Sequence, residues 1–253
     1  MLRVFLTGAS SGIGEALARC HAEQGAALGL VARRGEVLEA LRAGLPHAER
    51  HRVYALDVND HAALAAAAHD FLDHHGGIDV VVANAGVSHG TLTEHAEDLP
   101  VFGQIISTNL LATVATFSPF VAAMRAQKAG RLVGIASVAG IRGLPGAGAY
   151  SASKAATISY CESLRVELHG SGLDVVTIAP GYIDTPMTQH NAYPMPFLMP
   201  ADKFARAAVA VIARGTSYAV IPWQMGIVAK LLRLLPNWLY DAAFSRAPHK
   251  ARK

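Results

Sequence analysis

Short apolar runs alternate with longer segments of helical spacing along most of the chain. The runs are rich in β-branched residues and too short for helices, so they predict strands that are buried on both faces. We expect strands at residues 4–6, 27–32, 52–56, 80–83, 131–136, 173–179 and 218–221. We expect helices at residues 15–24, 35–42, from a cap at Asn59 or Asp60 to 74, and at 100–126, 150–169 and 201–214.

Strands and helices that alternate in this way form a parallel sheet with helices on both faces, because each crossover passes through a helix and has one hand. The expected architecture is a doubly wound α/β domain with about seven parallel strands. Ligands bind beside the carboxyl ends of the strands in such a sheet. Every loop with unusual residues follows a strand, so the candidate site residues converge on one edge.

A glycine-rich turn, Thr7-Gly-Ala-Ser-Ser-Gly-Ile-Gly14, follows the first strand. A strand, a glycine turn and a helix start place free backbone N–H groups and the positive end of a helix dipole around one small volume, which suits a phosphate. Gly8 permits the tight turn, Gly12 lets a pyrophosphate approach the backbone, and Gly14 lets the helix pack close on the strand. A turn without a ligand is the alternative, because glycine-rich turns are common.

The composition is typical of one globular domain with a large core. The chain has 253 residues, of which 52% are hydrophobic and 16% are charged, and its formal net charge is +3. Arg246, Lys250, Arg252 and Lys253 contribute +4, so the rest of the chain carries −1. We therefore expect no nucleic-acid partner and a solvated, frayed tail.

Two cysteines, Cys20 and Cys161, show neither metal nor disulfide spacing, and they predict buried thiols in a reducing, cytoplasmic setting. His89, His95 and His190 are near the expected site but lack metal spacing, so we expect no metal. The first residues lead directly into a strand, which predicts no signal peptide. No uninterrupted apolar run has the roughly 18 residues of a membrane span.

Tyr150 and Lys154 are four residues apart, so on a helix they lie on one face. The pKa of a phenol is about 10, and a neighbouring ammonium would lower the pKa of Tyr150 toward the working pH, where the phenol could give or take a proton. Ser137, at the end of a neighbouring strand, offers a hydroxyl that could hold a substrate oxygen beside this phenol. For the pair by itself, a helix face with an exposed lysine is the alternative.

The chain resembles the classical short-chain dehydrogenases/reductases (SDRs) over roughly residues 2–222. The resemblance rests on motifs in the family's order and at its usual separation: Thr7–Gly14, Asp57, Asn84-Ala-Gly86, Asn109, Ser137, Tyr150 with Lys154, and Pro180-Gly181 with Thr185. It implies a single Rossmann-type domain over residues 1–222 with a substrate lid at about 187–200. Residues 223–253 would form a C-terminal helical extension and basic tail of the same domain.

The resemblance also implies an NAD(P)-dependent enzyme that acts on CH–OH groups, with roles for its residues. Tyr150 would be the general acid in ketone reduction and the general base in alcohol oxidation. Lys154 would lower the pKa of Tyr150 and hold the cofactor ribose, and Ser137 would orient the carbonyl. Asn109 would support a water chain that resupplies protons. The cofactor-binding residues would be Gly8, Ser10, Ser11, Gly12, Ile13, Gly14, Asp57, Val58, Asn84, Ala85, Gly86, Tyr150, Lys154, Pro180, Gly181, Ile183 and Thr185.

Some of these roles have structural alternatives. Asp57 would accept a hydrogen bond from the adenine amino group, but it could be a helix cap. Asn109 could merely satisfy a neighbouring backbone carbonyl. Ile183 and Thr185 would touch the nicotinamide carboxamide, but Thr185 could cap a short helix.

The residues after the second strand predict the cofactor. An NAD-dependent enzyme would place an acid there to bind the ribose 2′-hydroxyl, whereas this chain has Arg33 and Arg34. Two guanidinium groups could clamp a 2′-phosphate, and Ser10 and Ser11 could add hydroxyl contacts. We therefore expect NADP(H) in preference to NAD(H), with solvated arginines as the alternative.

The loop at residues 187–200 predicts the class of substrate. It contains no Lys, Arg, Asp or Glu, and its apolar side chains are Met187, Tyr193, Met195, Phe197, Leu198 and Met199. In SDRs this position forms the substrate lid, so we expect an uncharged, largely apolar carbonyl or alcohol. The alternative is a lid that packs mostly on its own protein.

The C-terminal segment carries an apolar helix candidate at residues 227–235 with two cations, followed by Trp238, Leu239, Tyr240 and Phe244. It is too short to span a bilayer. A flap on the substrate cleft, a subunit contact and a peripheral membrane contact through residues 227–244 are all open. The resemblance implies a homodimer or homotetramer that pairs the helices at 100–126 and 150–169.

Two other functions were weighed against a secondary alcohol–ketone oxidoreductase. A reductase of 3-oxoacyl-thioester or long-chain lipid ketones is favoured if the C-terminal helix touches membrane. A catalytically silent nucleotide-binding scaffold is disfavoured, because it would be expected to have lost Ser137, Tyr150 or Lys154, and all three are present.

Overall fold

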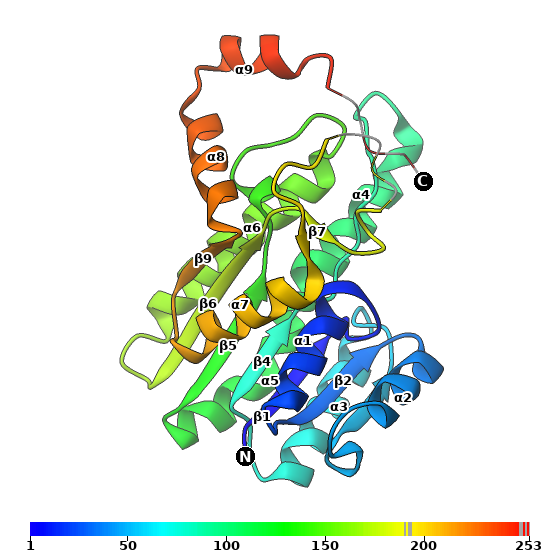
Figure 1. Cartoon of the computed structure of the whole chain (residues 1–253), viewed down its shortest axis with the longest axis vertical. Helices are drawn as coiled ribbons and strands as arrows, with labels where there is room; N and C mark the ends of the chain where they lie inside the picture. Colours follow the sequence, from blue (N-terminus) through cyan, green and yellow to red (C-terminus); the bar gives the residue numbers. More distant parts are fainter. Residues whose placement is uncertain (190, 192–193, 248–249, 251, 253) are drawn as a thin grey trace.

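The computed structural model describes residues 1–189, 191, 194–247, 250 and 252. Seven parallel strands form one sheet in the order β3-β2-β1-β4-β5-β6-β9 (Figure 1). The strands are β1 (Arg3–Thr7), β2 (Ala27–Ala32), β3 (Arg52–Ala55), β4 (Val80–Ala83), β5 (Gly130–Ile135), β6 (Leu173–Pro180) and β9 (Tyr218–Ile221). Two short strands, β7 (Ile183–Asp184) and β8 (Met199–Pro200), pair with each other in parallel. The doubly wound α/β fold expected from the sequence is confirmed.

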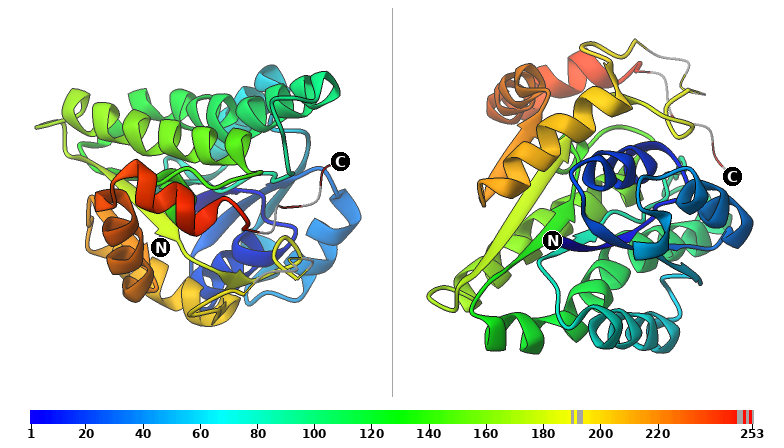
Figure 2. Two further views of the ribbon diagram at one scale, coloured as in Figure 1. Left: turned by 90° about the horizontal axis from the view of Figure 1, so that it is seen from above. Right: turned by 60° about the horizontal axis from the view of Figure 1, so that its bottom comes forward.

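Helices cover both faces of the sheet (Figure 2). The helices are α1 (Gly12–Glu23), α2 (Gly35–Ala43), α3 (His61–His75), α4 (Leu99–Ile106), α5 (Ala112–Gln127), α6 (Gly148–Glu167), α7 (Ala201–Ala213), α8 (Trp223–Leu234) and α9 (Asn237–Phe244). Val4 and Leu6 of β1 pack with α1, α2 and α7, whereas Phe5 packs with α3, α5 and α6. The sheet is therefore buried on both sides, which is why its strands are apolar at successive positions.

The strand order reverses between β1 and β4. β1 pairs with β2 on one side, with Thr7 opposite Val31, and with β4 on the other, with Leu6 opposite Val82. From β1 the chain continues to β2, and from β4 it continues to β5, which lies in the opposite direction along the sheet. A crevice therefore opens beside the carboxyl ends of β1 and β4.

Most element boundaries predicted from the sequence are right to within a few residues, and one helix differs in kind. In place of the single helix expected at 100–126, the structure has α4 and α5 joined by a π-helical turn, Ser107–Leu111 (η3). Short 3₁₀ turns occur at Ala48–Arg50 (η1), Ala96–Asp98 (η2) and Val138–Gly140 (η4). The helical run Ala96–Gln127 is long and apolar enough to cross a membrane by length and composition. It packs against α3 and α6 here, and the core helix of a soluble protein meets the same criteria.

The C-terminal segment is fixed to the body through the loop that follows η4. The Arg142 guanidinium donates to the carbonyls of Arg233 (3.2 Å) and Leu235 (3.3 Å) and lies 4.2 Å from the centroid of the Tyr240 ring. The Tyr240 hydroxyl donates to the carbonyl of Gly143 at 2.6 Å. The helix begins at Trp223, four residues before the expected start, and α8 and α9 lie at the end of the molecule beyond the carboxyl edge of the sheet (Figure 1).

Candidate active site

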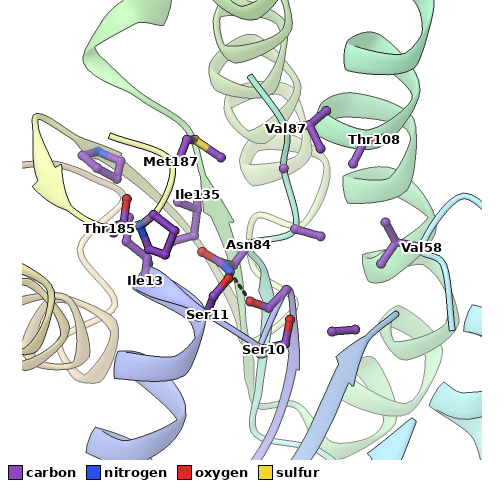
Figure 3. A pocket seen from close by; sticks show the side chains of 18 of the residues that line it. Ser10, Ser11, Ile13, Val58, Asn84, Val87, Thr108, Ile135, Thr185 and Met187 are labelled. Atoms are coloured by element: carbon purple, nitrogen blue, oxygen red, sulfur yellow. Dashed lines mark hydrogen bonds between the residues drawn. The ribbon is translucent and has the colours of Figure 1, made fainter. Parts of the chain in front are cut away.

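A cleft of ≈ 650 Å³ opens at the point where the strand order reverses. Its lining includes every residue expected to bind the cofactor, together with Ser137. Figure 3 shows Ser10 and Ser11 of the glycine turn, Ile13 at the start of α1, Ile135 of β5 and Thr185 after β7 around this cleft. Asn109 is the only expected site residue that does not line the cleft among the residues that the structure describes, and it lies behind the wall.

The glycine turn is packed too tightly for side chains at two of its positions. Gly8 has φ +71°, and a Cβ on it would lie 2.8 Å from the Asn84 side-chain nitrogen. A Cβ on Gly14 would strike the carbonyl oxygen of Gly8. The close approach of α1 to β1 therefore depends on Gly14, as the sequence predicted.

The start of α1 has unused hydrogen-bond donors that face the cleft. Ser11 is the N-cap, but its side chain makes no capping hydrogen bond, and Gly12 is the first helical residue. The first N–H groups of a helix have no partner within the helix and carry its positive dipole end. Both Ser11 and Gly12 line the cleft. This arrangement fits the pyrophosphate of a dinucleotide.

Hydrogen bonds join β1 to β4 at the floor of the cleft. The Thr7 hydroxyl accepts from the backbone N–H groups of Asn84 (3.1 Å) and Ala85 (3.2 Å). The Asn84 amide donates to the carbonyls of Thr7 (3.0 Å) and Gly8 (3.3 Å). Thr7 is thus a positioning residue that the sequence analysis missed, although its place at the end of a strand before the glycine turn was a usable signal.

The end of β2 presents the two arginines to the cleft. Arg33 and Arg34 are both exposed and line the cleft. Arg34 donates to the carbonyl (3.1 Å) and the hydroxyl (3.0 Å) of Ser10. Arg33 makes no hydrogen bond or ion pair within residues 1–189, 191, 194–247, 250 and 252. One guanidinium is therefore anchored beside the glycine turn and the other is available to an anion.

Asp57 also lines the cleft and is not a helix cap. Its carboxylate accepts from the backbone N–H and the side-chain amide of Asn59, both at 2.9 Å. The cap of α3 is Asp60, which accepts from the N–H of Ala63 at 3.0 Å. The structure therefore assigns the cap to Asp60, and Asp57 lies on the wall of the cleft.

Asn109 is fully buried in the π-helical turn. Its side chain accepts from the N–H of Val87 (2.8 Å) and donates to the carbonyl of Val87 (3.0 Å) and to the Ser153 hydroxyl (3.0 Å). The structural alternative from the sequence analysis is thus present: Asn109 holds the backbone that follows Gly86. A role in proton supply stays a prediction.

Ser137, Tyr150 and Lys154 meet at the carboxyl ends of β5 and β6. The Ser137 hydroxyl oxygen accepts from the N–H of Ala139 at 3.1 Å and forms a hydrogen bond with Tyr150. Tyr150 and Lys154 lie on one face of α6, with the ammonium 5.9 Å from the centroid of the phenol ring. The Lys154 ammonium donates to the carbonyl of Ile135 at 2.8 Å. A buried cation therefore stands beside the phenol, as the spacing predicted.

The pKa of Tyr150 differs from the expectation. Burial raises the pKa of Tyr150 above its ordinary value, because the phenolate loses hydration, and the hydrogen bond with Ser137 opposes this only in part. Burial also lowers the pKa of Lys154 to about 8. The expected lowering of this pKa by Lys154 is not seen for the protein groups alone: desolvation raises the pKa of Tyr150, and only the contact with Ser137 opposes it. The phenol keeps its proton at neutral pH.

Two supporting residues around this group were also missed. Ile135 acts through its carbonyl, for which the sequence carries no signal. Ser153 donates to the carbonyl of Tyr150 at 2.7 Å and accepts from Asn109, which connects the two halves of the site. Ser153 lies three residues after Tyr150 on the same helix, so helical spacing could have indicated it.

The remaining wall comes from the segment after β6. Pro180, Gly181, Ile183, Thr185 and Met187 line the cleft. Thr185 begins a turn, not a helix: its carbonyl accepts from the N–H groups of residues 188 (2.9 Å) and 189 (3.0 Å). The expected loop at 187–200 is tied at its base by the pairing of β7 with β8, which the sequence did not predict.

Several described residues of the lid are more exposed than a lid that packs on its own protein would be. Met187, Phe197 and Leu198 are 41%, 50% and 45% exposed, so the lid does not pack mostly on its own protein. Phe197 has a left-handed backbone, φ +58°, which is strained for an aromatic residue. Met187 borders the cleft, whereas Tyr193 and His190 lie outside the described residues.

The basic tail is not a frayed end where it is described. Lys250 donates to the Ser88 hydroxyl at 3.0 Å, and burial lowers the pKa of this lysine. Arg252 pairs with Asp98 (2.9 Å) and Glu97 (2.9 Å), and the Asp98 side chain is only 6% exposed. The sequence prediction was wrong here because charge composition alone does not show the acidic partners that lie far away in the chain. Lys250 and Arg252 therefore both contact the segment at residues 88–98, which follows the cleft residue Val87.

These features define a doubly wound dinucleotide-binding protein with a serine, a tyrosine and a lysine at the carboxyl edge of its sheet. A family model described as short chain dehydrogenase matches residues 3–194. The chain belongs to the short-chain dehydrogenase/reductase family and is an oxidoreductase of the kind that acts on CH–OH groups. The fold and the family inferred from the sequence are confirmed.

Relatives and solved structures agree with this family. The chain is 40% identical over 248 residues to an uncharacterized oxidoreductase from Myxococcus xanthus, covering 95% of each chain. It is 25% identical, with a TM-score of 0.79, to the 3-ketoacyl-(acyl-carrier-protein) reductase from Brucella melitensis complexed with NADH, covering 87% and 94% of the two chains. It is 26% identical, with a TM-score of 0.77, to an alcohol dehydrogenase from Thermococcus sibiricus complexed with 5-hydroxy-NADP, covering 87% and 95%.

Proposed function

We propose that the protein is an NADP(H)-dependent oxidoreductase that interconverts a secondary alcohol and a ketone on an uncharged, largely apolar substrate. The observation that carries this proposal is that Ser137, Tyr150 and Lys154 border the same cleft as the glycine turn and the two arginines. A nicotinamide cofactor, when bound, supplies or accepts the hydride.

The residues of the chain would position the reactants and move the proton. Ser137 would direct its hydrogen toward the substrate oxygen, because its oxygen is already oriented by the N–H of Ala139. Tyr150 would donate its proton to the forming alkoxide in reduction and take it back in oxidation. Because burial raises the pKa of Tyr150 further above neutral, the phenol holds its proton at neutral pH and is in the form that donates to a ketone oxygen.

Lys154, Asn109 and the glycine turn would have supporting roles. The charged Lys154 would hold the ribose hydroxyls and stabilise negative charge that develops on Tyr150. Asn109 and Ser153 would keep the wall and the catalytic helix in register through their mutual hydrogen bond. The helix start at Ser11 and Gly12 would hold the pyrophosphate.

The preference for NADP(H) rests on Arg33 and Arg34. Arg34 is anchored to Ser10 beside the glycine turn, which supports a contact between its guanidinium and a ribose 2′-phosphate. A bidentate guanidinium contact with phosphate is among the stronger charged hydrogen bonds in proteins. One of the similar solved structures contains NADH and another contains an NADP derivative, so likeness to them does not decide the cofactor. The proposed preference therefore rests on Arg33 and Arg34 of this chain.

Paired kinetics test the cofactor assignment. Arg33→Asp should lower kcat/KM for NADPH by about tenfold or more and leave kcat/KM for NADH unchanged or higher, because one contact to the 2′-phosphate is replaced by repulsion. Arg214→Asp is the matched control, because Arg214 is exposed at the far end of α7. An NADPH-to-NADH ratio that is the same in Arg33→Asp and wild type rejects the role of Arg33.

The apolar substrate is supported by the uncharged lid. Met187 borders the cleft. Phe197 and Leu198, from the same lid at 187–200, are exposed. A carbonyl panel followed by NADPH absorbance tests this class, with Tyr150→Phe as the blank. Higher activity on small charged sugars than on aromatic, steroid-like or acyl ketones would reject it.

A reductase of 3-oxoacyl-thioesters or long-chain lipid ketones is the second candidate function, favoured by the likeness to the Brucella reductase.

We also propose a cytoplasmic homo-oligomer, either a dimer or a tetramer. Both cysteines are free and buried, which suits a reducing compartment. Leu111 and Val166, on the helices expected to pair, are 49% and 63% exposed and would be covered by a second subunit. Light scattering of wild type and Val166→Asp tests this contact: a mass that is monomeric in wild type rejects it.

A further inference from the structure

Helix α8 is apolar on both faces, and the face turned to solvent carries several large side chains. Trp223, Ile227, Leu231 and Leu234 are 67%, 51%, 59% and 78% exposed. Their spacing of four, four and three residues places them on one helix face. On an ordinary surface helix the apolar stripe faces the core and the opposite face is polar.

The opposite face explains how α8 is held. Met225, Gly226 and Ala229 are its buried residues, and a Cβ on Gly226 would lie 3.1 Å from the Val220 side chain in β9. Small residues therefore let α8 pack close on the edge of the sheet, while Arg142 fixes its last carbonyls. The exposed apolar side chains do not contribute to this attachment, so their exposure is not required by the fold.

Helix α9 also exposes large apolar side chains, and this stretch of the chain carries only positive charge. Trp238 and Leu239 are 72% and 39% exposed. Lys230 and Arg233 are exposed on α8, and residues 223–240 contain no Asp or Glu. Tryptophans at both ends of an apolar surface with flanking cations are typical of a helix that lies in the plane of a membrane interface.

We propose that the face formed by Trp223, Ile227, Leu231, Leu234 and Trp238 binds the surface of a bilayer that contains anionic phospholipid. With 12 residues, α8 is far shorter than the ~20 that cross a bilayer, so it lies on the surface. The cations complement anionic headgroups, whereas a two-fold contact with a second copy would bring Lys230 and Arg233 against their own counterparts with no acid in the face.

The position of this face relative to the cleft indicates what membrane contact would do for the enzyme. α8, α9 and the loop that contains Phe197 and Leu198 lie at the same end of the molecule, beyond the carboxyl edge of the sheet (Figures 1 and 2). An enzyme held by α8 and α9 would present this end of its cleft to the lipid. Apolar substrates concentrate in that phase.

Intrinsic fluorescence tests the proposal directly, because the two tryptophans of the chain, Trp223 and Trp238, both lie on the face. The full chain is mixed with vesicles of phosphatidylcholine alone, or of phosphatidylcholine with phosphatidylglycerol. We expect a blue shift of the emission and co-sedimentation with the anionic vesicles, both weakened by salt. Absence of a shift and of co-sedimentation with either vesicle overturns the proposal.

Two variants separate the apolar and the charged contributions. Ile227→Asp with Leu231→Asp keeps both tryptophans and should abolish binding, whereas Val37→Asp, on the exposed side of α2, should bind as wild type does. Lys230→Glu with Arg233→Glu should weaken binding to anionic vesicles by about tenfold or more, since each basic residue contributes about 1 kcal/mol near such a surface. Equal binding to the two vesicle compositions would overturn the proposal that Lys230 and Arg233 contact anionic headgroups.

The outcome for a second copy is also decisive. If the face is a subunit contact, the mass of the oligomer in vesicle-free buffer falls in the Ile227→Asp with Leu231→Asp variant, and the membrane proposal is overturned. Activity toward a soluble ketone, measured without vesicles, reports separately on the proposed oxidoreductase. Far-ultraviolet circular dichroism of each variant shows that its helices have formed.

Discussion

The glycine turn after β1 and helices α8 and α9 of the C-terminal segment all lie on the carboxyl side of the sheet, but different kinds of contact hold the turn and the segment (Figure 1). The turn is fixed by short backbone hydrogen bonds through Thr7 and Asn84, and a Cβ on Gly14 would strike the backbone. The C-terminal segment is fixed by long side chains, Arg142 and Arg252, that reach from one element to another and are partly exposed. The first region has no freedom to adapt, whereas the second does.

This difference matches what each region would bind. A cofactor has the same shape in every turnover, so a preformed cradle lowers the cost of binding it. A lipid surface has no fixed shape, so the C-terminal segment would benefit from apolar side chains that can rearrange, and Trp223, Ile227 and Leu231 are exposed enough to do so. Substitutions in the two regions should therefore have effects of different size and kind.

The largest expected effect is on the proton donor at the boundary of the two regions. Tyr150→Phe removes the hydroxyl that exchanges the proton, so kcat/KM should fall about 10²–10⁴-fold. The melting temperature and the Kd of the cofactor should change little, since the ring and its packing remain. Tyr160→Phe, also on α6 but stacked on Phe117, is the control and should keep wild-type kinetics. Retention of activity in Tyr150→Phe would remove Tyr150 from the mechanism.

A methyl group in the glycine turn tests the rigid region. Gly14→Ala places a Cβ against the Gly8 carbonyl, so the free energy of unfolding should fall by about 1–3 kcal/mol and cofactor affinity should fall with it. Gly103→Ala in α4 meets no atom within 4 Å and should stabilise the protein by up to about 1 kcal/mol. Chemical denaturation and cofactor titration measure both. Equal effects of the two substitutions would show that the turn is not tightly constrained.

The pH dependence of ketone reduction tests the buried cation. Burial lowers the pKa of Lys154 to about 8, so its charge is present below pH 8 and is lost as the pH rises through that value. Reduction should therefore decline above about pH 8, by about tenfold for each further pH unit. In Lys154→Arg the guanidinium stays charged, so the decline should move to higher pH in the activity that remains.

The control for this profile is Lys203→Arg on the exposed side of α7, which should leave the decline in place. A profile that is flat between pH 7 and about 10 would assign the ammonium no part in the reaction.

The smallest expected effect concerns the tail. Arg252→Ala removes the ion pairs with Asp98 and Glu97, so KM for the ketone should rise a few-fold while the Kd of the cofactor stays constant. Arg252 contacts the loop beside the substrate side of the cleft and is not among the residues that line the cleft. Arg246→Ala, in the same exposed tail, is the control. If the Kd of the cofactor changed as much as KM for the ketone, the tail would not act on substrate binding separately from cofactor binding, and this prediction would be wrong.

Much of the fold and the cofactor side could be predicted from the sequence because their signals are local. Apolar runs placed β2, β4 and β9 within the observed bounds, and the glycine spacing predicted the contact of α1 with β1. All residues expected to bind the cofactor line one cleft, since parallel strands bring their carboxyl ends to one edge. Their roles in binding stay predictions.

Other features could not be predicted because they depend on contacts between distant parts of the chain. Asn109 resembles an ordinary helical residue, and only the folded chain shows it buried in a π-helical turn against Val87 and Ser153. The partners of Arg252 are more than 150 residues away in the sequence. The burial that raises the pKa of Tyr150 comes from several elements at once.

The sequence by itself determined the sheet, the edge at which the site forms and the residue types that meet there, because strand periodicity and helical spacing act over a few neighbouring residues. Tertiary structure alone decided the protonation of Tyr150 and Lys154, the docking of the tail and the outward direction of the apolar face of α8. Desolvation and long-range ion pairs depend on which groups surround an atom in space, and sequence order does not specify that.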